Sequence, residues 1–170
     1  MPFTNIALLI ILMIAVLTDL SQRKIPNLLT FPAMLLGVLI NSYQSGVGGL
    51  LFSAGGLALG LGLLLLFYLF WMMGAGDVKL MGAVGSFLGP MGVFQAFLFT
   101  ALAGGLYAVV VLALKGQLLR FLKRLWQSVF LSLAQKKLML LPDEGAKALP
   151  VLCYGVAIAV GTTVSMFYHF

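Results

Sequence analysis

The sequence predicts an all-α, polytopic membrane protein, and both its composition and its run lengths point to that class. Of the 170 residues, 62% are hydrophobic and 8% are charged, with a mean hydropathy of +1.15. An ordinary soluble domain does not have this composition. The apolar residues form runs long enough to cross a bilayer as helices, which takes roughly 20 residues. They do not alternate with polar residues as the strands of a membrane barrel would.

We expect about six transmembrane helices, over residues 3–20, 27–43, 47–72, 77–90, 92–114 and 149–168. The fourth span is short. Residues 76–116 nevertheless hold two spans if Gly89-Pro90-Met91-Gly92 forms a turn. Glycines that recur at helix-packing spacing, such as Gly56, Gly60 and Gly85, are expected to let neighbouring helices approach closely.

Within the basic segment 115–147, residues 115–137 are too charged to span a membrane. Their leucines recur at helical spacing, mostly opposite the basic residues, so we predict that they form a cytoplasmic amphipathic helix that lies in the membrane interface and binds lipid. Residues 142–145 are expected to form a solvated loop. We treat residues 1–170 as a single membrane-embedded domain that includes this segment.

Basic residues predict the orientation. Arg23 and Lys24, then Lys79, then the basic residues of segment 115–147 all fall on one side of the membrane, and the opposite side has no Lys or Arg. The positive-inside rule makes the basic side cytoplasmic and both termini outward-facing. The first helix is expected to be retained, because its start lacks a basic n-region and a cleavage site. The net charge of +6 is thus explained by topology and not by nucleic-acid binding.

Asp19 and Asp77 are the only acidic residues in the first 142 positions, and each lies where an apolar run meets its polar end. The predicted topology brings both to the cytoplasmic boundary. Ionisable groups at membrane depth are costly and are usually functional. Two carboxylates that meet can share one proton, so that one acts as base and the other as acid on a water that attacks a peptide carbonyl.

Other interpretations remain open from the residues alone. Asp19 could pair with Arg23 four positions on, and Asp77 could stabilise a helix start. The two carboxylates could also form the relay of a proton-coupled transporter or channel, or belong to a structural membrane component, although a transporter would place its acids nearer the midplane. Because Cys153 is the one cysteine, no disulfide is expected, and we assign no metal or cofactor.

Two motifs carry a resemblance to a known family. Gly74-Ala75-Gly76-Asp77 matches the GxGD signature of intramembrane aspartic proteases, and its continuation to Leu80 resembles the type IV prepilin peptidase form. Asp19, followed by Ile25-Pro26-Asn27, is similar to the first-aspartate segment of that family. Pro150 and then Tyr154-Gly155 resemble its Pro-Tyr-Gly stretch near the C-terminus, with three residues intervening here.

The resemblance implies a bacterial inner-membrane aspartic endopeptidase with Asp19 and Asp77 as catalytic residues. It would remove the basic leader of prepilins or pseudopilins on the cytoplasmic side. Larger members carry a domain with paired CxxC motifs and also N-methylate the product. This chain looks like the small tight-adherence (Flp) pilus branch, and S-adenosylmethionine is not assigned.

The residues around the aspartates have predicted supporting roles. Gly74 and Gly76 let another backbone approach Asp77, and Pro26 and Asn27 would shape and cap the start of the second helix. Lys24 and Lys79 could tune the dyad electrostatically, but contact with lipid headgroups is favoured. The predicted partners are the prepilin substrate and membrane lipids, with contact to the pilus assembly machinery left open.

Overall fold

The computed structural model describes residues 2–69, 73–116, 123 and 153–168, and the regular secondary structure within those ranges is helical. The helices are α1 (Pro2–Gln22), α2 (Asn27–Leu69), α3 (Ala75–Leu114) and α5 (Tyr154–Tyr168). By length and composition α1, α2 and α3 can each cross a membrane, and α5 is apolar but shorter. The predicted all-α class is confirmed for the described residues, and three of their helices are long and apolar enough to cross a membrane.

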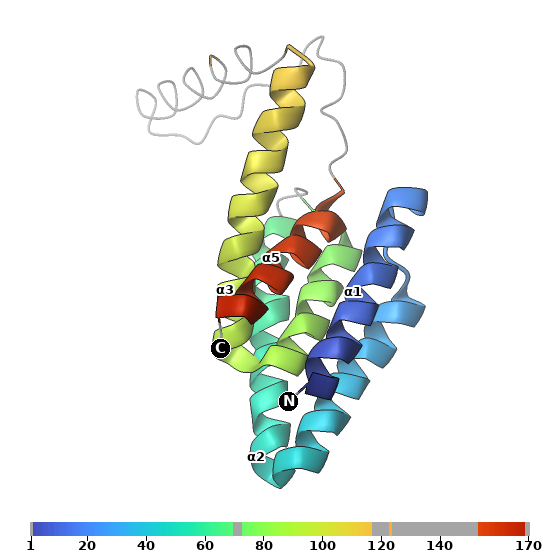
Figure 1. Cartoon of the computed structure of the whole chain (residues 1–170), viewed down its shortest axis with the longest axis vertical. Coiled ribbons are helices and arrows are strands. Elements are labelled where there is room, and N and C mark those ends of the chain that lie inside the picture. The colour runs from blue at the N-terminus through green and yellow to red at the C-terminus, as the bar shows by residue number, and fades with distance from the viewer. Residues whose placement is uncertain (1, 70–72, 117–122, 124–152, 169–170) are drawn as a thin grey trace. The chain divides into compact units, whose positions relative to one another are not determined.

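Each of the two longest helices contains a glycine at which the backbone leaves helical geometry. Gly46 has φ 58° in α2, and Gly89 has φ 70° in α3, a region that glycine enters without steric cost. The chain reverses direction at both positions, so that α2 and α3 each form two arms (Figure 1). Gly46 falls between the predicted spans 27–43 and 47–72, and Gly89 opens the predicted turn at residues 89–92. The count of six spans stays a prediction, because three helices of the described chain satisfy the length and composition criteria.

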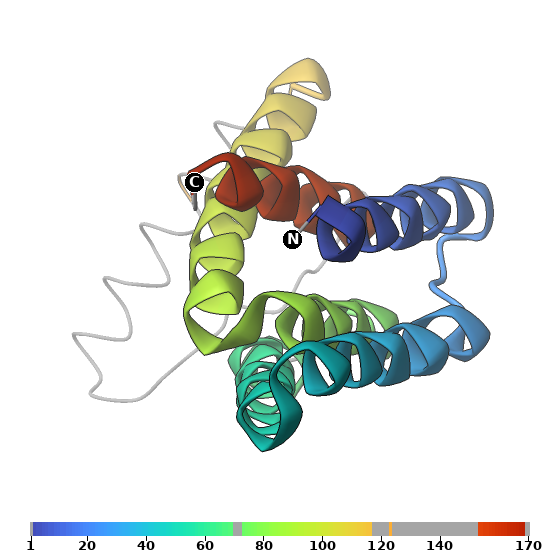
Figure 2. The same ribbon diagram turned by 60° about the horizontal axis from the view of Figure 1, so that its bottom comes forward.

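The chain divides into two compact units, residues 1–104 with 153–170, and residues 105–152. In the first unit α1 packs against α2 and α5, and Figure 2 shows α1 beside α5. The described part of the second unit comprises the last turns of α3, the turn at Lys115-Gly116 and Lys123. The rest of the predicted interfacial helix lies outside the described residues.

The core of the first unit is filled by aliphatic side chains from several helices. Five that are at most 2% exposed are Leu8, Leu12, Met81, Val84 and Ile158. Other apolar side chains point outward, among them Leu28 at 86% and Phe3 at 82% exposure. Such apolar exterior surface suits a hydrocarbon environment, where it has no cost of hydration.

The second arm of α2 and the first arm of α3 pack with their backbones in direct contact. Gly56 lies against the carbonyl of Gly85, and Gly60 lies against the carbonyl of Met81. A Cβ atom at either position would overlap the facing oxygen. The predicted role of these glycines in close helix packing is confirmed, and this packing fixes α3 at the level of its first turns.

A buried polar network supports the reversal of α3. Pro90 has no N–H to donate to the carbonyl of Ser86, which would be its acceptor in a continuous helix. The side chains of Asn41 and Ser53 donate to this carbonyl instead, at 3.0 and 2.7 Å. Asn41 also donates to the carbonyl of Phe87 at 3.3 Å. Both arms of α2 therefore satisfy backbone acceptors that the break in α3 leaves free.

We expect Gly56→Ala to lower the free energy of unfolding by about 1–3 kcal/mol, the usual range for overpacking, because the methyl group must displace the backbone of α3. Gly62→Ala in the same arm is the matched control, since a Cβ there meets no atom within 4 Å. Its stability should be unchanged or higher, because alanine is the better helix former. Unfolding in detergent micelles, followed by circular dichroism, measures both variants. Equal stability of the two would contradict this packing.

Candidate active site

Asp19 lies in the last turn of α1, at the point where the helix ends. The amide of Arg23 donates to the carbonyl of Asp19 at 2.8 Å, and Arg23 then takes a left-handed conformation with φ 53° that terminates the helix. The Asp19 side chain is only 7% exposed. Its Oδ2 accepts a hydrogen bond from the amide of Gly155 at 2.9 Å. The partner of this buried carboxylate is thus a backbone N–H and not the guanidinium of Arg23.

Asp77 occupies the first turn of α3 and is half-buried. Its Oδ2 accepts from the amide of Gly74 at 3.2 Å, while its own amide donates to the carbonyl of Gly74 at 3.1 Å. This is the reciprocal pattern by which an acidic residue in the first turn caps a helix. The helix-start role considered for Asp77 is therefore present, and it fixes the position of the carboxylate.

Asp19 and Asp77 lie at neighbouring helix ends, because the segment that follows α1 packs at Ile25 against Gly76, the residue before Asp77, and the charge of Asp19 acts on Asp77. They come from the end of one helix and the start of another, separated by the whole of α2. Each has one oxygen held by a glycine amide. The structure therefore brings together the two residues that the sequence predicts to act as a pair.

The segment between α1 and α2 docks directly on the Gly74–Asp77 motif. A Cβ atom at Gly76 would lie 3.1 Å from the Cβ of Ile25 and 3.2 Å from its carbonyl oxygen. Ile25 itself is 8% exposed. Gly76 thus lets the backbone before Pro26 approach the start of α3, as glycine at this motif was predicted to do.

Lys79 forms a second link between the two motifs. Its Nζ donates to the Oδ1 of Asn27 at 2.8 Å and lies 5.0 Å from the centroid of the Phe31 ring. Asn27 and Phe31 are four positions apart and so share one face of α2. The contact of Lys79 with lipid headgroups stays a prediction.

The remaining predicted site residues lie around this contact. Pro26 provides the carbonyl that accepts from the amides of Leu29 and Thr30 at 3.0 and 3.3 Å. Pro26 and not Asn27 therefore occupies the cap position of α2, and the Asn27 side chain is bonded to Lys79. Lys24 is exposed in the turn between the helices.

Gly155 and Phe31 are site residues to which sequence reasoning gave no role. Tyr154-Gly155 was noticed only as part of a resemblance, and a glycine opening an apolar helix carries no signal of what its amide will meet. Phe31 lies one turn after Asn27 on the same face of α2, but its role depends on the contact with Lys79, which no local pattern indicates.

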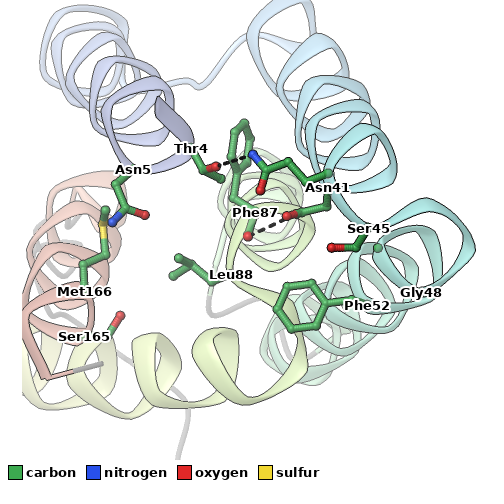
Figure 3. Close-up of a pocket in the computed structure, with 12 residues that line it drawn as sticks. Thr4, Asn5, Asn41, Ser45, Gly48, Phe52, Phe87, Leu88, Ser165 and Met166 are labelled. Carbon is green, nitrogen blue, oxygen red and sulfur yellow. Dashed lines mark hydrogen bonds between the residues drawn. The ribbon is translucent and has the colours of Figure 1, made fainter. Parts of the chain in front are cut away.

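A separate cavity of about 510 Å³ lies at the other ends of the helices. Neutral polar and apolar side chains line it, and Figure 3 shows Thr4, Asn41, Phe87 and Ser165 around it. Thr4 is 15 positions before Asp19, which corresponds to about 22 Å along α1. Neither Asp19 nor Asp77 lines this cavity. It is therefore separate from the aspartate site.

Two nearby carboxylates, each oriented by a backbone donor, can perform general acid–base chemistry on a water molecule between them. Asp19 is only 7% exposed, so solvent screens its charge poorly, whereas Asp77 is half-buried. The geometry fits hydrolysis of a bond brought to this end of the helices.

Residues 6–109 match the model of the type IV leader peptidase family. The match includes Asp19, Asp77 and both motif segments, and it ends before α5 begins at Tyr154. No curated protein and no solved structure matches the chain.

We expect Lys79→Met to lower the free energy of unfolding by about 1 kcal/mol, because it removes the hydrogen bond to Asn27 and the charge beside the Phe31 ring. Lys24→Met is the matched control. It changes a basic residue of the same region that lies exposed in the turn, so its stability should stay within about 0.5 kcal/mol of wild type. Unfolding in detergent micelles measures both, and an equal loss in the two variants would argue against the link.

Proposed function

The chain belongs to the type IV leader peptidase family, and we propose that it is an intramembrane aspartic endopeptidase that removes the basic leader peptide of Flp-type prepilins or pseudopilins. In this proposal Asp19 and Asp77 are the catalytic residues. The reaction takes place at the cytoplasmic boundary of the bacterial inner membrane. Family membership implies a protease. The aspartic mechanism and the Flp-type substrate are what the proposal adds.

One observation supports the aspartic mechanism above all others. Asp19 and Asp77 are far apart in the chain, yet their charges interact, and each carboxylate is held by the amide of a glycine. A helix cap alone would account for Asp77. It would not account for a second carboxylate, 7% exposed, placed beside the first. Burying two like charges together lowers stability, so a protein that retains such a pair usually uses it.

The mechanism follows from the chemistry of such a pair. One carboxylate accepts a proton from a water molecule while the oxygen of that water forms a bond to the scissile carbonyl carbon. The protonated carboxyl group hydrogen-bonds to the carbonyl oxygen as that oxygen gains negative charge. When the tetrahedral intermediate breaks its C–N bond, the leaving amine takes up a proton from the pair. The products are the leader with a new carboxyl terminus and the pilin with a new amine.

The cytoplasmic location is supported by the residues around the dyad. Arg23, Lys24 and Lys79 lie at the same helix ends as the aspartates, and the positive-inside rule assigns such residues to the cytoplasm. A prepilin whose apolar segment lies in the bilayer would keep its basic leader on that side. Its scissile bond would then meet the dyad.

The Flp-type substrate is supported by what these 170 residues contain. They hold one cysteine, Cys153, and hence no paired CxxC motifs. Only residues 23–26 connect α1 to α2, so no CxxC-bearing domain lies between these two helices. We also propose that segment 115–147 contacts lipids and that the protein contacts the pilus assembly machinery. The described residues do not bear on either contact.

The alternative function is a proton relay in a transporter or channel. The position of the carboxylates favours hydrolysis, since Asp19 lies in the last turn of α1 and Asp77 in the first turn of α3. A relay would be expected near the middle of the spans.

We expect Asp19→Asn and Asp77→Asn each to lower prepilin cleavage by about 10³-fold or more, the scale of loss when one member of a catalytic unit is removed. The asparagine side chain keeps the shape of the carboxyl group but cannot exchange a proton with the water. Cleavage of a tagged Flp-type prepilin in membranes is read as a mobility shift.

Asp143→Asn is the control, because Asp143 lies outside both motifs, and its cleavage rate should equal that of wild type. Membrane insertion and thermal unfolding of all three variants should stay near wild type. Near-normal cleavage by either motif variant would contradict the dyad. A wild-type protein that conducts protons across vesicles without cleaving any prepilin would favour the relay.

A further inference from the structure

The first turn of α5 completes the aspartate site, although this helix lies beyond the residues matched by the family model. The amide of Gly155, the second residue of α5, donates to Asp19 Oδ2 at 2.9 Å across 136 positions of sequence. Both groups are buried. A residue outside the two motifs is therefore the direct hydrogen-bond partner of one of the two carboxylates.

The amide of Gly155 is free to make this bond because of its place in the helix. The first four N–H groups of an α-helix have no acceptor within the helix. A buried N–H must find a partner elsewhere, and a carboxylate is the strongest acceptor that a side chain offers. The partial positive charge at the start of α5 adds to the attraction. Asp19 therefore caps α5 while α5 orients Asp19.

The missing side chain at Gly155 is as important as its amide. A Cβ atom there would lie 2.8 Å from Asp19 Oδ2, 3.1 Å from its Cβ and 3.2 Å from its Cγ. These distances are shorter than the ordinary van der Waals separation, so even alanine would push the carboxylate away. The hydrogen bond and the close contact both restrict the orientation of the Asp19 carboxylate.

Two other contacts, one on each side of Gly155 in sequence, keep α5 in place independently of Asp19. The ring of Tyr154 approaches Gly104 of α3, where a Cβ would lie 3.3 Å from the ring edge. Gly161 packs against the backbone of Thr100 so closely that a Cβ would overlap its amide nitrogen. Because α5 is held at these points, a change at Gly155 should move the Asp19 side chain more readily than the helix.

We propose that Gly155 is a positioning residue of the peptidase reaction: its N–H and its lack of a side chain hold Oδ2 of Asp19, and so leave Oδ1 for the water shared with Asp77. The proposal rests on the proposed function. It extends the site from two segments to three and gives α5 a catalytic purpose beyond filling the membrane domain. Gly155 itself contacts no substrate in this scheme.

The kinetic test compares Gly155→Ala with wild type for cleavage of a purified prepilin in detergent micelles. We expect kcat to fall by about 10²-fold, the size of effect that a displacement near 1 Å can produce, with KM changed less than twofold. A purely structural role would lower the amount of folded enzyme and leave kcat per folded molecule unchanged. Gly161→Ala, which disturbs the packing of the same helix, should behave in that second way.

A second measurement does not depend on activity. Hydrogen–deuterium exchange of the full chain in micelles reports on the amide of Gly155 through peptides that begin before Cys153 and span Gly155. Asp19→Ala removes the acceptor, so exchange in this peptide should rise at least tenfold, whereas Asp77→Ala, the matched control, should leave it unchanged. Unchanged exchange in Asp19→Ala would overturn the contact.

The outcomes separate the two proposals. No cleavage by wild type would overturn the proposed function while the exchange result still tested the contact. Cleavage by wild type together with a normal kcat for Gly155→Ala would overturn the positioning role alone.

Discussion

The constraint on which this structure depends is the placement of two acidic side chains together inside an apolar protein. A carboxylate removed from water must be given hydrogen bonds in return. Here each receives one from a glycine amide at a helix start, Gly155 for Asp19 and Gly74 for Asp77. The helices that carry these amides must therefore begin at the same level of the molecule. The ends of α1, α3 and α5 are arranged by this requirement.

The rest of the packing keeps those three helix ends in register. Gly76 packs against the backbone of Ile25, and Lys79 donates a hydrogen bond to Asn27. These contacts join the segment after Asp19 to the segment around Asp77. Farther along, the contact between Gly56 and Gly85 fixes α2 against α3. A close backbone approach is rigid because it leaves no side chain to adjust. Close backbone approaches at Gly76 and Gly56 thus help to hold the helix ends that carry the two aspartates.

Sequence reasoning was reliable where a local pattern carries the information. The apolar runs indicated the helices, and Gly89-Pro90 indicated a reversal, which the structure has at Gly89. Span parity predicted that Asp19 and Asp77 share one membrane boundary, and this stays a prediction, although both lie at helix ends. Sequence reasoning did not provide the contact between Gly155 and Asp19, because no local pattern says which helix start will lie beside which helix end. Sequence reasoning also predicted that Asn27 caps α2. The side chain of Asn27 instead accepts a hydrogen bond from Lys79, a distant residue that no local pattern indicates. Partners that are distant in sequence are determined by packing alone.

The most direct test of the convergence of the two motifs is a disulfide between Ile25→Cys and Gly76→Cys in a Cys153→Ser background. A Cβ at position 76 would lie 3.1 Å from that of Ile25, close to the separation that a disulfide requires, about 3.5–4.5 Å. Mild oxidation of membranes should link the pair rapidly, and Ile25→Cys with Gly62→Cys should stay unlinked. Failure of the first pair to form a disulfide, with both cysteines accessible to a thiol reagent, would contradict the site described above.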